Sequence, residues 1–268
     1  MKILDIDMDY FLNCDIHIGS DDSIERLSEE DYGNEVWSEA EVRNFLESNL
    51  GLSKSHKIPG RIVVGHNESL FFWQELISAG KLITPFEVIH VDTHADLGLG
   101  YASWGYICKE LLDYPVEERP YHAVYNFNGK EMREGIGDYL LFAIAYRMIS
   151  SLTYCGNPNK ECNDYILNTL KNFEEKTVLP GGNPVRNTIQ LLGIKQEFPK
   201  NNANRDVKQR FIDNSLKEPE VPLLIIPRVE DVQYNGNFDF AVLAQSPNYT
   251  PASADFIMGV FKDYIEEM

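Results

Sequence analysis

The sequence predicts an α/β fold built on a central, mostly parallel sheet of about eight strands. Short apolar runs alternate with segments of helical periodicity along the whole chain of 268 residues, which is typical of strands joined by helical crossovers. Several runs are continuously apolar, such as Leu-Leu-Ile-Ile at 223–226, and continuous runs indicate strands buried on both faces. No repeat or low-complexity tract divides the chain, so we expect one domain over residues 1–268.

Eight runs have the length and composition of buried strands. We predict strands at Lys2–Asp7, Arg61–Gly65, Glu87–Asp92, His122–Phe127, Leu152–Cys155, Thr188–Ile194, Pro222–Ile226 and Phe238–Leu243. In an open parallel sheet, ligands bind beyond the carboxyl ends of the strands. The residues that follow these runs are therefore the first place to look for a functional site.

The clearest helix begins at Ser38, because Ser38 and Glu41 form a capping-box pattern and Gly51 closes the segment. The turn-rich segments 177–187 and 195–206 are expected to be exposed loops that border the active site. The further predicted helices are Ser69–Ala79, Ser103–Leu112, Ile136–Ile149, Asp164–Phe173, Ala203–Leu216 and Ala252–Glu267.

The charge of the chain restricts its partners. Its 42 acidic and 24 basic residues give a formal charge of -18, which argues against binding to nucleic acid or to an anionic membrane surface and favours a cationic partner. The N-terminus lacks the pattern of a signal peptide. The four cysteines form no zinc-site spacing, so we expect reduced thiols and a cytoplasmic protein. The oligomeric state stays open. These cysteines are Cys14, Cys108, Cys155 and Cys162.

The strongest functional signal is the segment His90-Val-Asp92-Thr-His94-Ala-Asp96, which follows an apolar strand. Residues two apart on an extended chain point to the same side, so Asp92, His94 and Asp96 are predicted to converge where the chain leaves the strand. A carboxylate–imidazole–carboxylate cluster suits a divalent metal ion with mixed oxygen and nitrogen ligands.

Three aspartates, Asp5, Asp7 and Asp9, alternate with apolar residues at the end of the first predicted strand. Like charges on one side of a strand end repel one another, and without a cation some of them would have to be protonated. A bound metal ion removes this conflict.

A third motif, Gly65-His66-Asn67-Glu68-Ser69, joins a predicted strand to a helix. Its histidine or glutamate would lie at the same edge of the sheet as the other motifs. Together the three motifs offer more ligands than one ion needs, and the surplus favours two ions. Hard oxygen donors with one or two imidazoles suit Mn²⁺, with Fe²⁺ and Zn²⁺ as alternatives.

These motifs resemble those of the fold shared by arginases, agmatinases and histone deacetylases. The segment 90–96 resembles their Asp-x-His-x-Asp motif, and 65–70 resembles a strand-to-helix motif that supplies a further ligand in arginases. The segment 5–9 resembles their Asp-x-Asp motif, but here it lies at the N-terminus, which suggests a rearranged strand order. With Ser246–Asp255, the chain is similar to the arginase-like family that includes peptide arginases, which hydrolyse arginine side chains in ribosomally made peptides to ornithine.

The resemblance implies a three-layer fold, two divalent ions and a ligand set drawn from all three motifs. Asp5 is a candidate to support a ligand from behind. The third motif leaves two alternatives, because aligning its Ser-Leu selects Glu68 and aligning on residue type selects His66, with the other nearby or acting as proton shuttle. Asp96 is also expected to accept and relay a proton. The implied ligands are Asp7, Asp9, Asp92, His94 and Asp96, with His66 or Glu68.

The implied activity is hydrolysis of arginine side chains in a precursor peptide to ornithine, with release of urea. The late strand, however, ends without the glutamate by which arginases contact the guanidinium, so Asp239, Glu230 and Asp231 are candidates for that contact. Three alternatives stay open: a deacetylase-like amidohydrolase with one Zn²⁺, a small-molecule ureohydrolase, and a peptide-binding module with a structural metal.

Overall fold

In the computed structural model, residues 1–13, 26, 29, 36–199 and 204–268 are described. An eight-stranded sheet runs through the middle of this part of the chain, in the order β12-β2-β11-β1-β3-β6-β10-β7, and every neighbouring pair except β10 and β7 is parallel. The predicted α/β fold with about eight mostly parallel strands is confirmed. The sheet strands are β1 Lys2–Asp7, β2 Ile58–Val63, β3 Phe86–Asp92, β6 Ile149–Gly156, β7 Val185–Ile189, β10 Val221–Ile226, β11 Phe240–Ala244 and β12 Ile265–Glu267.

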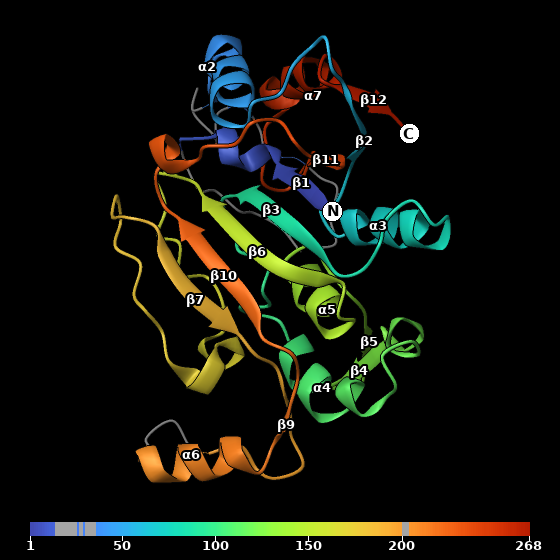
Figure 1. The fold of residues 1–268 in the computed structure, drawn as a ribbon, viewed down its shortest axis with the longest axis vertical. Helices are drawn as coiled ribbons and strands as arrows, with labels where there is room; N and C mark the ends of the chain where they lie inside the picture. The colour runs from blue at the N-terminus through green and yellow to red at the C-terminus, as the bar shows by residue number, and fades with distance from the viewer. Residues whose placement is uncertain (14–25, 27–28, 30–35, 200–203) are drawn as a thin grey trace.

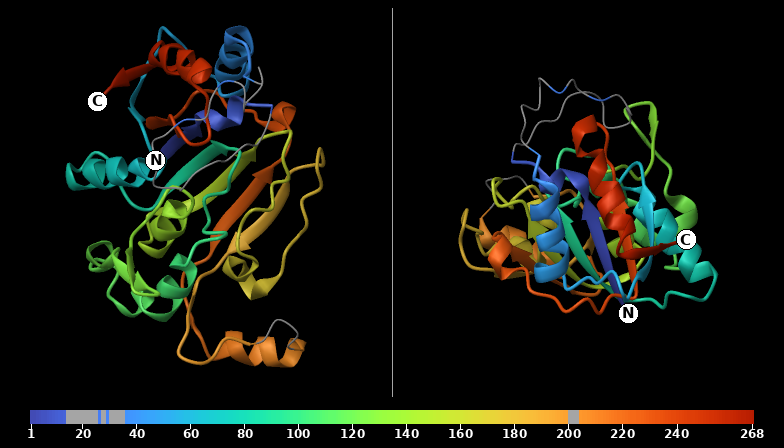
Figure 2. Two further views of the ribbon diagram at one scale, coloured as in Figure 1. Left: turned by 180° about the vertical axis from the view of Figure 1, so that it is seen from behind. Right: turned by 90° about the horizontal axis from the view of Figure 1, so that it is seen from above.

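Helices cover both faces of the sheet (Figure 1), with α2 and α7 on one face and α3, α4 and α5 on the other. A further helix, α6, projects away from the sheet at one end of the molecule (Figure 2). The bounds are α2 Glu39–Asn44, α3 Glu68–Ser78, α4 Ser103–Lys109, α5 Tyr139–Ala145, α6 Arg205–Asp213 and α7 Phe256–Lys262.

Alternating residues of the central strands pack into two separate hydrophobic cores, one on each face of the sheet. On β1, Ile3 packs into the core under α3, α4 and α5, and Leu4 and Ile6 pack into the core under α2 and α7. On β3, Val88 packs into the first of these cores and Ile89 into the second. This alternation follows from the two-residue repeat of an extended chain and produces a three-layer arrangement, as expected.

Two of the predicted strands are wrong in part. Only Tyr125–Phe127 of the run His122–Phe127 is a strand, β4, and it pairs with β5 (Lys130–Met132) in a hairpin outside the main sheet. Asn128 and Gly129, both with positive φ, form the turn, and Asn-Gly is a strong hairpin signal. The run Thr188–Ile194 overlaps the end of β7 and also β8 (Leu192–Gly193), which pairs with β9 (Leu216–Lys217).

Several predicted helices are shorter than expected or absent. The helix expected over Asp164–Phe173 is two 3₁₀ turns, Leu167–Thr169 and Lys171–Phe173, with positive φ at Asn172. The helix Ile136–Ile149 is reduced to α5, and β6 begins at Ile149. The C-terminal helix, predicted to continue to Glu267, ends at Lys262 as α7. The residues after it form β12, which pairs with β2 at the edge of the sheet.

Ser38→Ala is expected to lower the free energy of unfolding by about 1 kcal/mol. Ser38 Oγ accepts a hydrogen bond from the Glu41 backbone N–H, and the Glu41 carboxylate accepts one from the Ser38 N–H at 2.7 Å, so the predicted capping box at α2 is present. Urea denaturation followed by circular dichroism measures the change. Ser38→Asp, which keeps an oxygen acceptor, should lose much less, and equal losses in the two variants would contradict the assignment.

Candidate metal centre

The acidic motif at the end of β1 supplies carboxylates to the α3 and α5 side of the sheet. Because Leu4 and Ile6 face the other core, the alternation places Asp5 and Asp7 on this side. Asp9 lies in the 3₁₀ turn Met8–Phe11 that follows the strand, and its N–H donates to Asp7 Oδ1 at 3.0 Å. All three aspartates are buried.

The second motif lies directly beside the first, because β3 pairs with β1 and His90 is opposite Asp5 in the register. Asp92 is the last residue of β3, and the chain then turns through Asp96, whose φ of 50° is in the left-handed region. The His94 N–H donates to Asp92 Oδ1 at 2.8 Å and so fixes the start of this turn. Non-glycine residues with positive φ are uncommon and are often found at functional sites.

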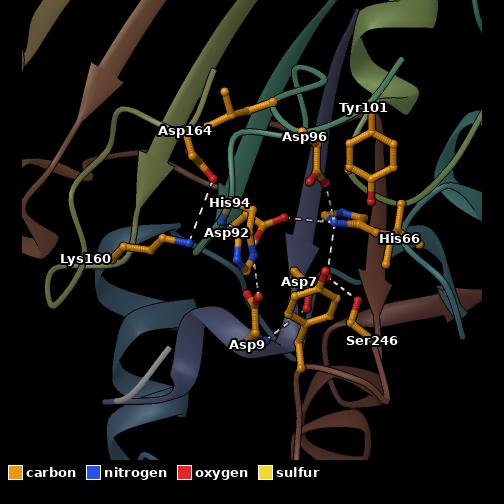
Figure 3. Close-up of a pocket in the computed structure, with 15 residues that line it drawn as sticks. Asp7, Asp9, His66, Asp92, His94, Asp96, Tyr101, Lys160, Asp164 and Ser246 are labelled. Atoms are coloured by element: carbon orange, nitrogen blue, oxygen red, sulfur yellow. Dashed lines mark hydrogen bonds and ion pairs between the residues drawn. The ribbon is translucent and has the colours of Figure 1, made fainter. Parts of the chain in front are cut away.

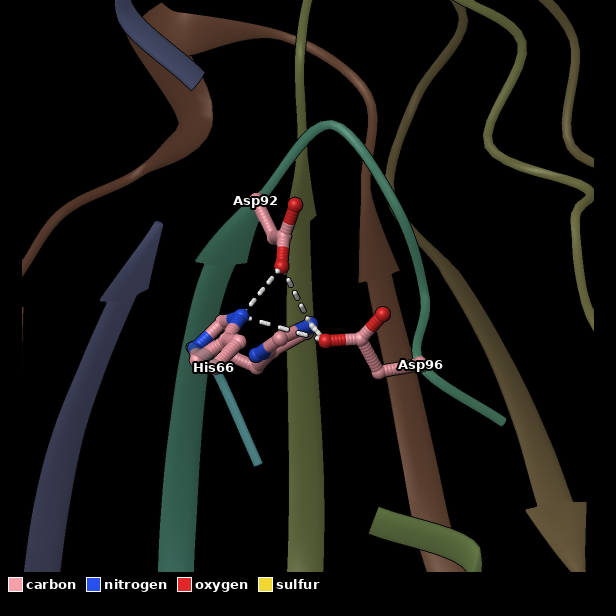
Figure 4. Close-up of side chains that lie close together, drawn as sticks. His66, Asp92 and Asp96 are labelled. Carbon is pink, nitrogen blue, oxygen red and sulfur yellow. Dashed lines mark ion pairs between the residues drawn. The ribbon is translucent and has the colours of Figure 1, made fainter. Parts of the chain in front are cut away.

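His66 lies in the turn between β2 and α3 and meets the carboxylates of both other motifs. Its Nδ1 atom is 3.1 Å from Asp7 Oδ2, 2.9 Å from Asp92 Oδ2 and 3.1 Å from Asp96 Oδ2. The imidazole is only 1% exposed. Figure 4 shows His66 and Asp96 facing Asp92. The structure therefore brings the three predicted motifs together at the carboxyl edge of the sheet.

The donor atoms form two overlapping sets. One set is His66, His90, Asp92 and Asp96, and the other is Asp9, Asp92 and His94; within each set the ligand atoms lie within 4.8 Å of one another. Both sets contain Asp92, whose two carboxylate oxygens face different sides. A shared carboxylate is the usual bridge between two ions in dinuclear centres. The first set could hold a metal ion, and the second offers a neighbouring position.

Unsatisfied polar atoms at the centre fit a cation. Both ring nitrogens of His66 and Asp96 Oδ2 are buried and have carboxylate or imidazole atoms close by, but none of them makes a hydrogen bond of good geometry within the described part of the chain. Buried polar atoms in native proteins are nearly always satisfied, so this group of crowded atoms without well-formed hydrogen bonds indicates a ligand site. The mixed carboxylate and imidazole donors match the preferences of a divalent ion such as Mn²⁺.

His90 belongs to the first set by distance, but both of its ring nitrogens face other acceptors. Its Nδ1 atom is 3.2 Å from Asp5 Oδ2, and its Nε2 atom is 3.0 Å from the carbonyl oxygen of His94. We infer that His90 holds these two groups in place, which leaves His66, Asp92 and Asp96 as the stronger ligands of this set. The sequence analysis did not select His90 as a site residue, although its two-residue spacing from Asp92 puts it on the same side of β3.

Asp5 is fully buried beside the candidate ligands and accepts hydrogen bonds from two of the covering helices, α3 and α5. Ser69 Oγ of α3 donates to Asp5 Oδ1 at 2.8 Å, and the Tyr139 hydroxyl of α5 donates to Asp5 Oδ2 at 2.5 Å. The same Oδ2 atom is 3.3 Å from His66 Nε2. Asp5 therefore faces the imidazole of His66, and its expected role as the support of a metal ligand stays a prediction. Outer partners of this kind fix the orientation of metal-binding histidines.

The pKa values of the group reflect crowding of like charges. Burial, together with the charges of Asp9, Asp96 and Asp7, raises the pKa of Asp92 well above its usual range. Burial alone would also raise the pKa of Asp5, but the neighbouring His66 and His90 hold it far below that range. A metal ion would stabilise all of these carboxylates in the charged form.

His66 takes the role of the cation in the metal-free protein. Burial opposes a charge on this imidazole, but Asp5, Asp7 and Asp92 outweigh it and raise the pKa of His66 well above its usual value. A metal ion that binds to His66 must therefore displace a proton.

The ligand cluster opens into a cavity of about 390 Å³ (Figure 3). Asp164 and Lys160, 3.9 Å apart, lie on one side of it, and Tyr101 lies on the other. Ser246, which follows β11 and has a φ of 44°, donates from Oγ to Asp7 Oδ2. The sequence analysis selected none of these four residues, because their positions depend on how distant loops fold back to the sheet edge.

Several predicted residues lie elsewhere. The Glu68 carboxylate accepts a hydrogen bond from the Gly65 N–H at 3.1 Å and lines a neighbouring cavity, so of the two alternatives it is His66 that joins the cluster. Asp239 accepts a hydrogen bond from the Lys2 N–H at the amino end of β1, away from the site. Asp231 pairs with Arg228 at 2.6 Å, with Glu230 also near this arginine.

None of these three acids, which were candidates for a guanidinium contact, lines the metal cavity. The described residues of the segments 177–187 and 195–206 do not line it either. Cys14 and the start of the helix predicted from Ala203 lie outside the described residues.

Comparisons with known proteins give no relative: no model of a protein family matches the chain, and neither a curated protein nor a solved structure matches it. None of the helices in the described part of the chain has the length and apolar character that crossing a membrane requires.

Mn²⁺ is expected to stabilise the wild-type protein and to have little effect on Asp92→Asn. A ligand at a concentration of about 100 times its Kd adds roughly 2.7 kcal/mol to the free energy of unfolding, which raises Tm by several degrees in a chain of this size. Asp92→Asn removes the carboxylate common to both donor sets. Differential scanning calorimetry with and without Mn²⁺ measures the shift.

The matched control is Glu117→Gln, an exposed residue outside the cavity that undergoes the same loss of charge. It should keep the full Mn²⁺-dependent shift. Glu68→Gln should keep it as well. An unchanged shift in Asp92→Asn would contradict the placement of the metal site.

Mn²⁺ affinity is expected to fall as the pH is lowered. The pKa values of His66 and Asp92 are raised in the metal-free protein, so below those values the ion must displace bound protons. Each displaced proton weakens the apparent affinity about tenfold per pH unit. Titration calorimetry in two buffers with different ionisation enthalpies counts the protons released, and binding without proton release at about pH 6 would argue against these ligands.

Proposed function

We propose that the protein is a hydrolase that uses two divalent metal ions, with Mn²⁺ as the preferred metal, to convert arginine side chains in a peptide to ornithine with release of urea. The observation that carries this proposal is the pair of donor sets that share Asp92 beside an open cavity. Two ions at such a site lower the pKa of a water molecule and polarise the group that it attacks. The motif resemblance to arginase-like enzymes supplies the choice of arginine.

The walls of the cavity support a cationic substrate. Five aspartates line it, Asp7, Asp9, Asp92, Asp96 and Asp164, against one lysine, Lys160. A guanidinium group would enter a field of negative charge, and the net charge of the chain strengthens this field at long range. We infer that the cavity selects a cation before any chemistry takes place.

The reaction needs a proton carrier, and Asp96 is the residue that we assign to it. Its Oδ2 atom lies 3.1 Å from His66 Nδ1 but makes no well-formed hydrogen bond with a described residue, and Asp96 lines the cavity. The water oxygen adds to the guanidinium carbon while Asp96 takes one proton of that water. Asp96 returns this proton to the side-chain nitrogen as its bond to the carbon breaks, and the remaining hydroxyl proton passes to the released amine, which yields ornithine with a charged amino group and neutral urea.

A peptide is favoured over free arginine by the space around the site. A second cavity, of about 430 Å³, adjoins the first, and the two share Ile136, Ser246 and Tyr249 in their walls. Together they offer more room than one amino acid fills. Contacts with the remote parts of a longer substrate can orient the reacting group, and truncated substrates then lose kcat as well as affinity.

The Mn²⁺-loaded protein is expected to release urea from an arginine-containing peptide, with a kcat/KM at least about tenfold above that for free arginine. Asp92→Asn should be inactive, and Glu117→Gln should match the wild type. Mass spectrometry of the peptide and a urea assay, each with and without Mn²⁺, measure the reaction.

Three outcomes would replace the proposal. Equal or faster turnover of free arginine would make the protein a small-molecule ureohydrolase. Release of acetate from an acetyl-lysine peptide, without release of urea, would make it a deacetylase-like amidohydrolase. Metal binding without either reaction would favour the non-enzymatic peptide-binding module.

A further inference from the structure

The second cavity begins at the turn that carries His66. His66 lines the metal cavity, whereas its neighbours Asn67 and Glu68 line the second one. Ser246 lines both, and its hydroxyl donates to the metal-site residue Asp7. A group bound in the second cavity would therefore lie next to the residues that support the ligands.

Glu134 is the unusual residue of this cavity. It is only 4% exposed, and its Oε2 atom has no hydrogen-bond partner among the described residues. The carbonyl oxygen of Glu134 accepts a hydrogen bond from Asn67 Nδ2 at 3.3 Å, which ties the residue to the His66 turn. A buried carboxylate oxygen without a partner is costly, and burial raises the pKa of Glu134. A bound cation would offset that cost.

Within the described residues, no lysine or arginine forms a close ion pair with Glu134 Oε2. The nearest guanidinium nitrogen of Arg133 is 3.8 Å from Glu134 Oε1, so it does not meet Oε2, and the Arg133 side chain is 66% exposed. An ion pair at this distance with an exposed arginine contributes little. Lys130 also lines the cavity but is exposed and has no ion pair with Glu134. Two further carboxylates, Glu68 and Glu131, lie in the same walls.

We propose that the second cavity binds an ammonium or guanidinium group on a substrate residue next to the arginine that is hydrolysed, and that Glu134 is the residue that selects it. The carboxylate accepts hydrogen bonds from the bound cation at Oε2. The substrate class is thus a peptide with at least two basic residues close together. The cation site stands on the geometry of the cavity alone, whereas its role in substrate choice rests on the proposed function.

The cation site is tested without turnover by titrating the Mn²⁺-loaded protein with acetyl-trilysine amide, which has no guanidinium group. Titration calorimetry at about 0.15 M salt limits long-range attraction. We expect the wild type to bind this peptide at least about tenfold more tightly than Glu134→Gln does, a difference of about 1.4 kcal/mol. Glu117→Gln should bind within about twofold of the wild type, since it loses the same charge at an exposed position outside both cavities.

Circular dichroism and the Mn²⁺-dependent rise in Tm establish that Glu134→Gln is folded and keeps its metal site. If it fails this check, Glu134→Asp, which keeps the charge but shortens the reach, takes its place with the same expected loss. Equal affinity in the wild type and the folded variant, or no binding of trilysine to the wild type, would overturn the cation site.

The role in substrate choice is tested with two arginine peptides whose flanking residues are lysine in one and glutamine in the other. The wild type should release urea faster from the lysine-flanked peptide, and Glu134→Gln should lose this preference while it keeps its rate on the glutamine-flanked one. An unchanged preference in the variant would refute the role. If neither peptide releases urea, the proposed hydrolase fails, and the trilysine titration still decides the cation site.

Discussion

Crowding of buried carboxylates at one edge of the sheet is the constraint on which the rest of the site depends. Asp7, Asp9, Asp92 and Asp96 are each no more than 6% exposed, and like charges at such distances in a medium of low dielectric repel strongly. The metal-free protein relieves this repulsion by protonation, as the raised pKa values of Asp92 and His66 indicate. Two divalent ions would relieve it more completely, because they neutralise charge and satisfy the free donors at once.

The fold creates this crowding by making β1 and β3 neighbours in the middle of the sheet. Their parallel register sets Asp5 opposite His90, and both motifs then leave the sheet at the same edge. Two helices of the covering layer, α3 and α5, fix the arrangement from behind, since Ser69 and Tyr139 both donate to Asp5. The position of the site therefore follows from strand order, and its orientation follows from hydrogen bonds to a residue that touches no substrate.

The sequence predicted the parts of the fold and site that depend on local patterns. The two-residue alternation in β1 and β3 placed Asp7 and Asp92 on one side of the sheet, and the capping pattern located α2. It missed short edge elements such as β12, because three residues carry little periodicity, and it missed Ser246 and Asp164, which reach the site through tertiary folding. The choice between His66 and Glu68 also depended on the tertiary structure, because the turn directs the two side chains into different cavities.

The central claim is that two ions lie close enough to share Asp92, and electron paramagnetic resonance of the Mn²⁺-loaded protein tests it most directly. Two Mn²⁺ ions joined by one carboxylate are magnetically coupled, whereas separate ions are not. We predict the spectrum of a coupled pair at full loading, which Asp92→Asn should abolish. A spectrum of isolated Mn²⁺ at every loading would contradict the account and reduce the site to a single ion.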